Sequence, residues 1–399
     1  MPITDGKYVN PGWRNKMAPA IAQQELQNLC DTLEDALWPE LFVTLADTGT
    51  TVTATKGSTT VTLTETDGVW FGVLDSLGTW TVTGLIDGES VSNSVEVETV
   101  GQYSLALQAP IPEDINDASW NVISSVAQAG TAASYWSIGD CKSVTLNGTM
   151  GTLSLNTTLY VYIIGINHRG TNGITFQGFK TAKSGGVDVC LVGPNYSSDF
   201  RDGTKTFNVN HWGTSSAPNN TNYGGWAACD MRYDILGSTD VSPTPYGSTK
   251  TTTATGSDPT ATCATSPVSN TLMSCLPSTL RAVLRPMTVY TDNKGNSGSV
   301  AANVTATTDY LPLLAEFEIF GARTYANQYE QNYQSQYDYY AAGNSTVKYR
   351  HSATGSTAYW WERSPYYDNA FRFCFVDIDG TASNDTSRGS FGVAPAFMV

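Results

Sequence analysis

The chain closes with residues 359–399, YWWERSPYYDNAFRFCFVDIDGTASNDTSRGSFGVAPAFMV, around which the rest of the sequence is organised. A Trp pair followed by an arginine opens this stretch, and an apolar segment that contains Gly and Pro ends it. Between them, aromatic and Arg side chains are mixed with short polar ones, which is typical of a binding surface. We therefore predict a recognition surface at about residues 364–391, held between the framework residues Trp360, Trp361, Arg363, Gly392 and Pro395.

The predicted ligand contacts divide by chemistry. Tyr and Phe supply rigid contact area, Asp, Asn, Ser and Thr supply hydrogen bonds, and Arg supplies charge. The predicted contact residues are Tyr366, Tyr367, Asp368, Asn369, Ala370, Phe371, Arg372, Phe375, Asp377, Asn384, Asp385, Thr386, Ser387, Arg388 and Phe391.

Composition is that of a folded, β-rich protein. The chain has 399 residues, 40% hydrophobic and only 14% charged, so it can form two or three domains with real cores. The net charge of −15 argues against a nucleic-acid partner, because phosphate binding needs clustered Lys and Arg. No apolar run is long enough to cross a membrane, and the first residues lack the pattern of a secretory signal. We expect no membrane insertion.

Neither a metal centre nor a catalytic centre is predicted. The seven cysteines are scattered without a CxxC pair, and only three histidines accompany them, so we expect reduced thiols and no zinc site. His168 follows a predicted strand, where bonding to local backbone explains it better than catalysis does. Asp377 and Asp379 would share one face of a strand, so a role of these two carboxylates as Ca²⁺ ligands stays open. No cofactor is expected.

Residues 1–40 are predicted to form an N-terminal arm and a short helix. Leu26, Leu29 and Leu33 follow helical spacing, and the helix should end before Pro39. The helix is too short to form a stable coiled coil alone. Packing on its own domain and docking or oligomerisation therefore both stay open.

Residues 41–107 are predicted to form an immunoglobulin-like β-sandwich. Apolar and polar residues alternate in short runs, and Asp67-Gly68 and Asp87-Gly88 lie between such runs as hairpin turns. Strands spaced by about 8–12 residues are typical of this sandwich. The fold alone leaves a spacer and an adhesion module as alternatives.

Residues 108–130 are predicted to be a Pro-rich linker and a helix that is capped by Asp117 and stopped by Gly130. The third domain, residues 131–399, follows.

The aromatic pair Trp360-Trp361 has two interpretations. Aromatic faces bind sugar rings, so the pair could form a stacking platform. Core packing is favoured, because the pair is flanked by apolar and small residues.

Several motifs carry a resemblance to known families. DGKYVNPGW (5–13) and DTLEDAL (31–37) resemble the attachment segment of tail-associated proteins from phages and prophages of gut bacteria. Six further motifs resemble a family of phage and bacterial proteins with a C-type-lectin-like fold. Some members of that family look like variable proteins of diversity-generating retroelements. In those systems an error-prone reverse transcriptase rewrites adenine positions of the gene. The six motifs are YWSIGD (135–140), LPSTLRAVLRP (276–286), EFEIFGARTYA (316–326), VKYRHS (347–352), YWWERSP (359–365) and GVAPAF (392–397).

The resemblance permits one check within the sequence. Randomising the adenines of Asn codons cannot produce Glu, Gln, Lys, Met or Trp. Residues 363–397 contain none of these five types, whereas the preceding 362 residues contain 49. At that frequency about five would be expected in the window. The chain departs from the family pattern at Glu362, where Leu is expected.

The resemblance implies a non-enzymatic receptor-binding protein of a phage tail tip or fibre. Its partners would be a host cell-surface protein or glycan and other phage tail proteins. It would be a homo-oligomer, with a trimer favoured, assembled in the bacterial cytoplasm and located on the virion. Three alternatives stay open: a structural virion decoration protein, a fixed bacterial adhesin, and an oxidase of the formylglycine-generating type. The oxidase needs reactive cysteines close together, and Cys374 between two Phe residues has the pattern of a buried thiol.

Overall fold

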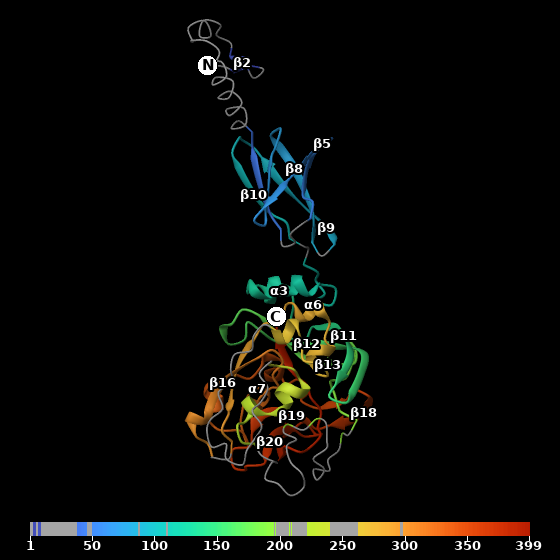
Figure 1. The fold of residues 1–399 in the computed structure, drawn as a ribbon, viewed down its shortest axis with the longest axis vertical. Helices are drawn as coiled ribbons and strands as arrows, with labels where there is room; N and C mark the ends of the chain where they lie inside the picture. The colour runs from blue at the N-terminus through green and yellow to red at the C-terminus, as the bar shows by residue number, and fades with distance from the viewer. Residues whose placement is uncertain are drawn as a thin grey trace. The chain divides into compact units, whose positions relative to one another are not determined.

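The computed structural model describes residues 38–45, 50–86, 88–108, 111–194, 196, 207, 209, 222–239, 262–295 and 298–399, together with residues 3–4 and 7–8. The chain divides into two compact units, Met1–Pro110 and Ile111–Val399, which are coloured from blue to red in Figure 1. The helix predicted within residues 1–40 lies outside the described residues. Strands β1 (Ile3–Thr4) and β2 (Lys7–Tyr8) pair antiparallel.

The first unit contains two four-stranded sheets, with the orders β10-β3-β7-β6 and β5-β4-β8-β9. Pairing is antiparallel except between β10 and β3, which run parallel. The strands are β3 (Glu40–Thr44), β4 (Thr53–Lys56), β5 (Thr59–Thr62), β6 (Thr64–Thr66), β7 (Val69–Val73), β8 (Gly78–Ile86), β9 (Glu89–Val97) and β10 (Gln102–Ala106).

Alternating side chains give these two sheets one shared core. Trp70 of β7 and Trp80 of β8 come from different sheets, and both are fully buried in the same cluster. The predicted turn at Asp67-Gly68 joins β6 to β7. Both residues have positive φ (52° and 78°), as a two-residue hairpin turn of this twist requires.

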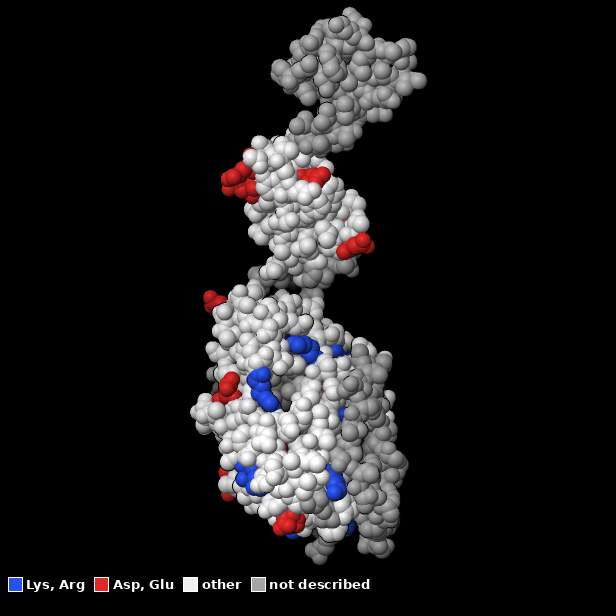
Figure 2. Space-filling model, turned by 90° about the vertical axis from the view of Figure 1, so that its left-hand side faces the viewer, with Lys and Arg blue, Asp and Glu red and all other residues white. Residues whose placement is uncertain are grey.

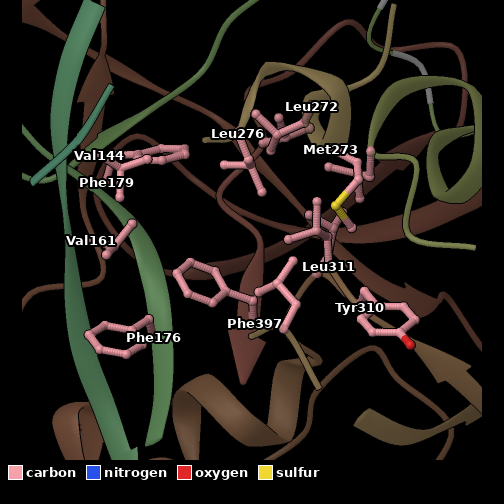
Figure 3. Close-up of a cluster of buried hydrophobic side chains, with 14 of the residues drawn as sticks. Val144, Val161, Phe176, Phe179, Leu272, Met273, Leu276, Tyr310, Leu311 and Phe397 are labelled. Atoms are coloured by element: carbon pink, nitrogen blue, oxygen red, sulfur yellow. The ribbon is translucent and has the colours of Figure 1, made fainter. Parts of the chain in front are cut away.

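The second unit is built around the antiparallel sheet β11-β12-β13-β22. Its strands are β11 (Cys141–Met150), β12 (Leu153–Ile166), β13 (Ile174–Lys180) and β22 (Ala396–Met398). The last strand of the chain pairs with β13, so that Phe397 lies opposite Phe176. Figure 3 shows these two rings side by side in the core, and their planes stack at a centroid distance of 5.4 Å.

Three smaller sheets complete this unit: β14-β17-β18, β15-β16 and β19-β20-β21. Their strands are β14 (Val189–Cys190), β15 (Met287–Asp292), β16 (Val304–Asp309), β17 (Lys348–Arg350), β18 (Ala353–Ala358), β19 (Trp360–Pro365), β20 (Arg372–Val376) and β21 (Ala382–Thr386). The helices are short. They are α3 (Trp120–Gln128), α4 (Thr262–Thr265), α5 (Leu272–Cys275), α6 (Ser278–Arg281), α7 (Glu316–Phe320) and α8 (Asp338–Ala341). Single turns lie at Ala132–Ser134, His168–Gly170, Trp226–Ala228, Met231–Ile235, Ala301–Asn303 and Glu330–Asn332.

Helix α3 is the helix predicted within residues 108–130, and it belongs to the second unit. Trp120 is buried, and its ring meets those of Phe176 and Phe397 at 5.6 and 6.2 Å. The N-cap is Ser119, whose Oγ accepts from Val122 N at 3.2 Å, so the prediction of Asp117 as the cap is wrong.

The described chain is therefore mainly β and multidomain, with short helices in the second unit. None of the described helices is long and apolar enough to span a membrane.

Candidate ligand-binding face

Strand β19 supplies the framework of the face. Trp360 and Trp361 are both 0% exposed, and they belong to two different core clusters because neighbouring side chains of a strand point to opposite faces. Each indole N–H donates to a backbone carbonyl, Trp360 to Thr346 at 3.0 Å and Trp361 to Phe207 at 2.9 Å. Since neither ring is exposed, the pair is part of the core and not a sugar-stacking platform.

The remaining framework residues are buried as well. The Arg363 guanidinium donates to both carboxylate oxygens of Glu318 at 2.6 Å and to Leu313 O at 2.8 Å. At Gly392, a Cβ would lie 2.2 Å from the Sγ of Cys190, so no larger residue fits. Pro395 is buried, and its carbonyl accepts from Gly178 N at 3.1 Å.

Residues 366–371 connect β19 to β20. Together with Arg372, the first residue of β20, they are called the recognition loop below. Phe371 is 46% exposed, Asp368 is also exposed, and Tyr366, Tyr367 and Asn369 are half-buried. Ala370 and Arg372, the other predicted contacts of this loop, are half-buried too. The structure thus brings the first seven predicted contact residues together in one accessible loop beside the buried framework.

Aromatic rings in and beside the recognition loop form a small cluster. Tyr366 and Tyr367 meet edge to face at 5.5 Å, and Tyr325 meets Tyr366 in the same way at 5.7 Å. The Arg323 guanidinium lies 5.5 Å from the centre of the Tyr367 ring. Sequence reasoning missed Arg323 and Tyr325 as parts of this face, although both lie in the motif EFEIFGARTYA.

Strand β21 adds a polar region next to the loop. It pairs with β20, and all its residues are half-buried. Arg372 Nη1 donates to Asn384 Oδ1 at 2.9 Å, which connects loop and strand. Partial burial raises the pKa of Asp385, whose Oδ1 accepts from Thr386 N at 2.5 Å. Arg388 is half-buried in the turn that follows.

Three predicted contacts are not on the surface. Phe375 and Phe391 are 4% and 0% exposed, and their rings meet at 4.8 Å beside Trp361 and Tyr359. Ser387 is also fully buried, and its N–H donates to Phe371 O at 2.8 Å. The prediction of these three as surface contacts is wrong. The two Phe rings pack against Trp361, and Ser387 is enclosed beside the recognition loop.

Asp377 and Asp379 do not share a strand face. They lie in the turn after β20, where Asp379 Oδ1 accepts from both N and Oγ1 of Thr381, at 3.0 and 2.6 Å. These hydrogen bonds lower the pKa of Asp379. Within the described part of the chain, no three His, Cys, Asp or Glu side chains are placed to hold a metal ion.

A group of buried carboxyls lies behind the framework strand. Glu330 is 1% exposed and accepts from Ser364 Oγ at 2.7 Å and from Asp292 N at 2.8 Å; burial raises its pKa to about 7. Glu362 is 0% exposed, and neither carboxylate oxygen has a hydrogen-bond partner in the described structure. Burial and then the neighbouring Glu316 and Glu330 raise its pKa well above the ordinary range. Glu362 is thus an uncompensated polar group in the core.

Histidines and cysteines show no catalytic arrangement among the described residues. His168 stacks on Tyr337 at 4.0 Å, and His351 Nδ1 accepts from Val192 N at 3.1 Å. Six cysteines are described, and all six are free and buried. Burial raises the pKa of Cys374 well above the ordinary value, which disfavours the thiolate that an oxidase would need. His211 and Cys30 lie outside the described residues.

Charged groups are spread thinly over the surface drawn in Figure 2. The blue Lys and Arg side chains form separate small groups on mostly uncharged surface. On this face, the described residues do not form the basic stripe that a phosphate backbone would need.

Residues 214–399 match a family described as a domain of unknown function, DUF6273. This segment includes the framework strand, the recognition loop and the last strand of the chain. No curated protein and no solved structure matches the chain.

Proposed function

We propose that this chain is a non-enzymatic receptor-binding protein of a phage tail tip or fibre. Its recognition loop and strand β21 would contact a protein or glycan on the host cell surface. In this proposal the side chains of the face are diversified by a retroelement, as in the variable proteins that the sequence resembles. The protein would be located on the virion after assembly in the bacterial cytoplasm.

One observation carries the proposal: a loop of exposed and half-buried side chains directly follows a framework strand whose side chains are all buried. Trp360, Trp361 and Arg363 are at most 1% exposed, whereas Phe371, a few residues later, is 46% exposed. Aromatic residues such as Phe and Tyr are enriched at binding interfaces relative to the rest of a protein surface. Aromatic, Arg, Asn and Asp side chains in one loop are the chemistry of an adaptable binding surface.

The proposal includes finer folds for both units. The first unit, with two sheets and one core, would be an immunoglobulin-like spacer, and the second would have a C-type-lectin-like fold closed by its last strand. Residues 1–40 would attach the chain to other tail proteins. A homo-oligomer, with a trimer favoured, would present several binding faces to one cell. The overall avidity would then exceed the weak affinity of a single site.

A matched pair of variants tests the binding role. Alanine at Tyr366, Tyr367 and Phe371 together should abolish attachment of the purified full-length chain to host cells, while the thermal unfolding midpoint stays within a few degrees. The control is Tyr135→Ala, because Tyr135 is exposed to a similar degree (44%) but lies outside the face. Unchanged attachment of the folded triple variant would refute the proposal.

Sequencing tests the diversification. The end of the gene would be sequenced deeply across a phage population, and its surroundings searched for a near-copy beside a reverse transcriptase. Substitutions confined to adenine positions of that copy support a diversified protein. A uniform sequence without a copy would instead favour a fixed adhesin or a structural virion protein.

A further inference from the structure

Asn222 contacts the main chain of the recognition loop at four points. Its Nδ2 donates to the carbonyl oxygens of Tyr366, Asn369 and Arg372 at 3.1, 2.6 and 3.0 Å. Its backbone N–H donates to Ala370 O at 2.7 Å. The residue is 0% exposed, and its Oδ1 makes no hydrogen bond with the described residues. One buried residue therefore holds the start, the middle and the end of the loop, in each case through a backbone carbonyl.

Two side chains of the loop take part in holding it, since Phe371 N donates to Asn369 Oδ1 at 2.8 Å and Arg372 Nη1 donates to Asn384 Oδ1 at 2.9 Å. Three further hydrogen bonds use only the main chain of the loop. Tyr367 N donates to Tyr325 O at 3.0 Å, and Tyr367 O accepts from Gly298 N at 3.1 Å. Phe371 O accepts from Ser387 N at 2.8 Å. Every non-proline residue offers the same backbone donor and acceptor, so these bonds do not depend on which side chain stands at each position.

Asn222 is itself fixed by close backbone packing. Gly225 N donates to Asn222 O at 2.9 Å. At Gly295, which has φ +66°, a Cβ would lie 2.3 Å from the same oxygen, so only glycine allows this approach. Asp292 Oδ1 holds the turn around Gly295 by accepting from Lys294 N and Gly295 N, both at 3.0 Å. The asparagine therefore has little freedom to follow a loop that moves.

We propose that Asn222 is the positioning residue of the ligand-binding face. It sets the path of the recognition loop through backbone carbonyls, and this makes the loop's conformation independent of the side chains at positions 366, 367, 368 and 371. The advantage of such a positioning residue rests on the proposed function, because it would allow contact residues to be exchanged without loss of the fold. The dependence of the loop's order on a residue far away in the chain can be tested without any ligand.

The decisive variant is Asn222→Asp. Aspartate has nearly the same shape as asparagine, but it places an oxygen where three carbonyl oxygens now receive hydrogen bonds. We expect backbone amides of residues 366–372 to exchange with deuterium at least about tenfold faster in this variant than in the wild type. Asn222→Ala removes the donor without adding repulsion, and it serves as the second variant if the aspartate form does not fold.

The matched control is Gln177→Glu, which also replaces a buried amide by a carboxyl. Gln177 is equally buried, and its Nε2 donates to Ala394 O at 3.1 Å, away from the recognition loop. A general loss of stability would affect both variants, whereas loss of positioning accelerates exchange of the loop only at Asn222. Equal loop exchange in the Asn222 variants and the wild type, or the same acceleration in Gln177→Glu, would overturn the assignment.

A second measurement tests independence from side chains directly. Tyr366, Tyr367, Asp368 and Phe371 would be replaced together by several random sets, with and without Asn222→Ala, in the full chain. With Asn222 present, thermal midpoints should stay within a few degrees of one another. With alanine they should spread widely. A wide spread in both backgrounds would contradict the inference while leaving ligand binding, which cell attachment measures separately, untouched.

Discussion

Arg363 and Glu318 form a two-pronged ion pair in the core of the second unit, with Nη1–Oε2 and Nη2–Oε1 distances of 2.6 Å. Arg363 is 1% exposed, and its Nε also donates to Thr291 Oγ1 at 3.1 Å. The pair joins β19 to the start of α7, where Glu318 also accepts from Ala315 N at 3.0 Å. It therefore anchors the strand from which the recognition loop begins.

Breaking this pair from one side should be costly. We expect Arg363→Met to lower the free energy of unfolding by about 3–5 kcal/mol, because the Glu318 carboxylate is left buried without its counter-charge. The double variant Arg363→Met with Glu318→Leu should recover much of this loss. Urea denaturation followed by Trp fluorescence measures both. A double variant as unstable as the single one would contradict the account.

Removing the unpartnered carboxyl of Glu362 should stabilise the protein. Glu362→Leu replaces a buried polar group that has no hydrogen-bond partner in the described structure, and a gain of about 1–3 kcal/mol is expected at neutral pH. Glu362→Gln serves as the control, since it keeps a buried polar group and should gain less. Thermal and urea unfolding of the wild type and the two variants measure these differences in stability. A Glu362→Leu variant less stable than the wild type would contradict this interpretation.

Buried Glu330 should make stability depend on pH. Its folded pKa of about 7 lies above its unfolded value, so the folded state keeps its proton over a range where the unfolded state loses it. This contribution is fully present below about pH 4.5 and is lost as the pH rises to about 7. Unfolding free energies at several pH values should show a smaller decline over this window for Glu330→Gln than for the wild type. If the unfolding free energies of the two proteins change in parallel with pH, Glu330 does not titrate in this pH window.

Three phenylalanines of one stretch should respond differently to the same substitution. Phe375→Ala and Phe391→Ala should each destabilise the protein by about 3–5 kcal/mol, because both rings are buried around Trp361. Phe371→Ala should change stability by no more than about 0.5 kcal/mol, since its ring is largely exposed. In a diversified population, accordingly, substitutions should be common at position 371 and rare at 375 and 391. Equal tolerance at the three positions would contradict the division between face and framework.

Much of the β architecture could be predicted from local sequence. Alternation around Trp80 and the turn at Asp67-Gly68 specify strands and a hairpin, because side-chain direction and turn geometry depend on near neighbours. Core packing of Trp360 and Trp361 could be predicted as well, because apolar and small residues flank the pair.

The tertiary structure alone decided which residues of the last stretch face inward and what holds its loop. Phe371 and Phe375 are the same residue type in the same stretch of sequence. Phe375 is buried because its ring packs against Trp361 and Phe391, which nothing in the local sequence indicates. Asn222 precedes its carbonyl partners by 144 to 150 residues, and nothing around it in the sequence indicates this role. A hydrogen bond between such distant residues depends on the folded path of the whole domain. The sequence alone could therefore indicate where a recognition surface lies, while the long-range contacts determine its shape.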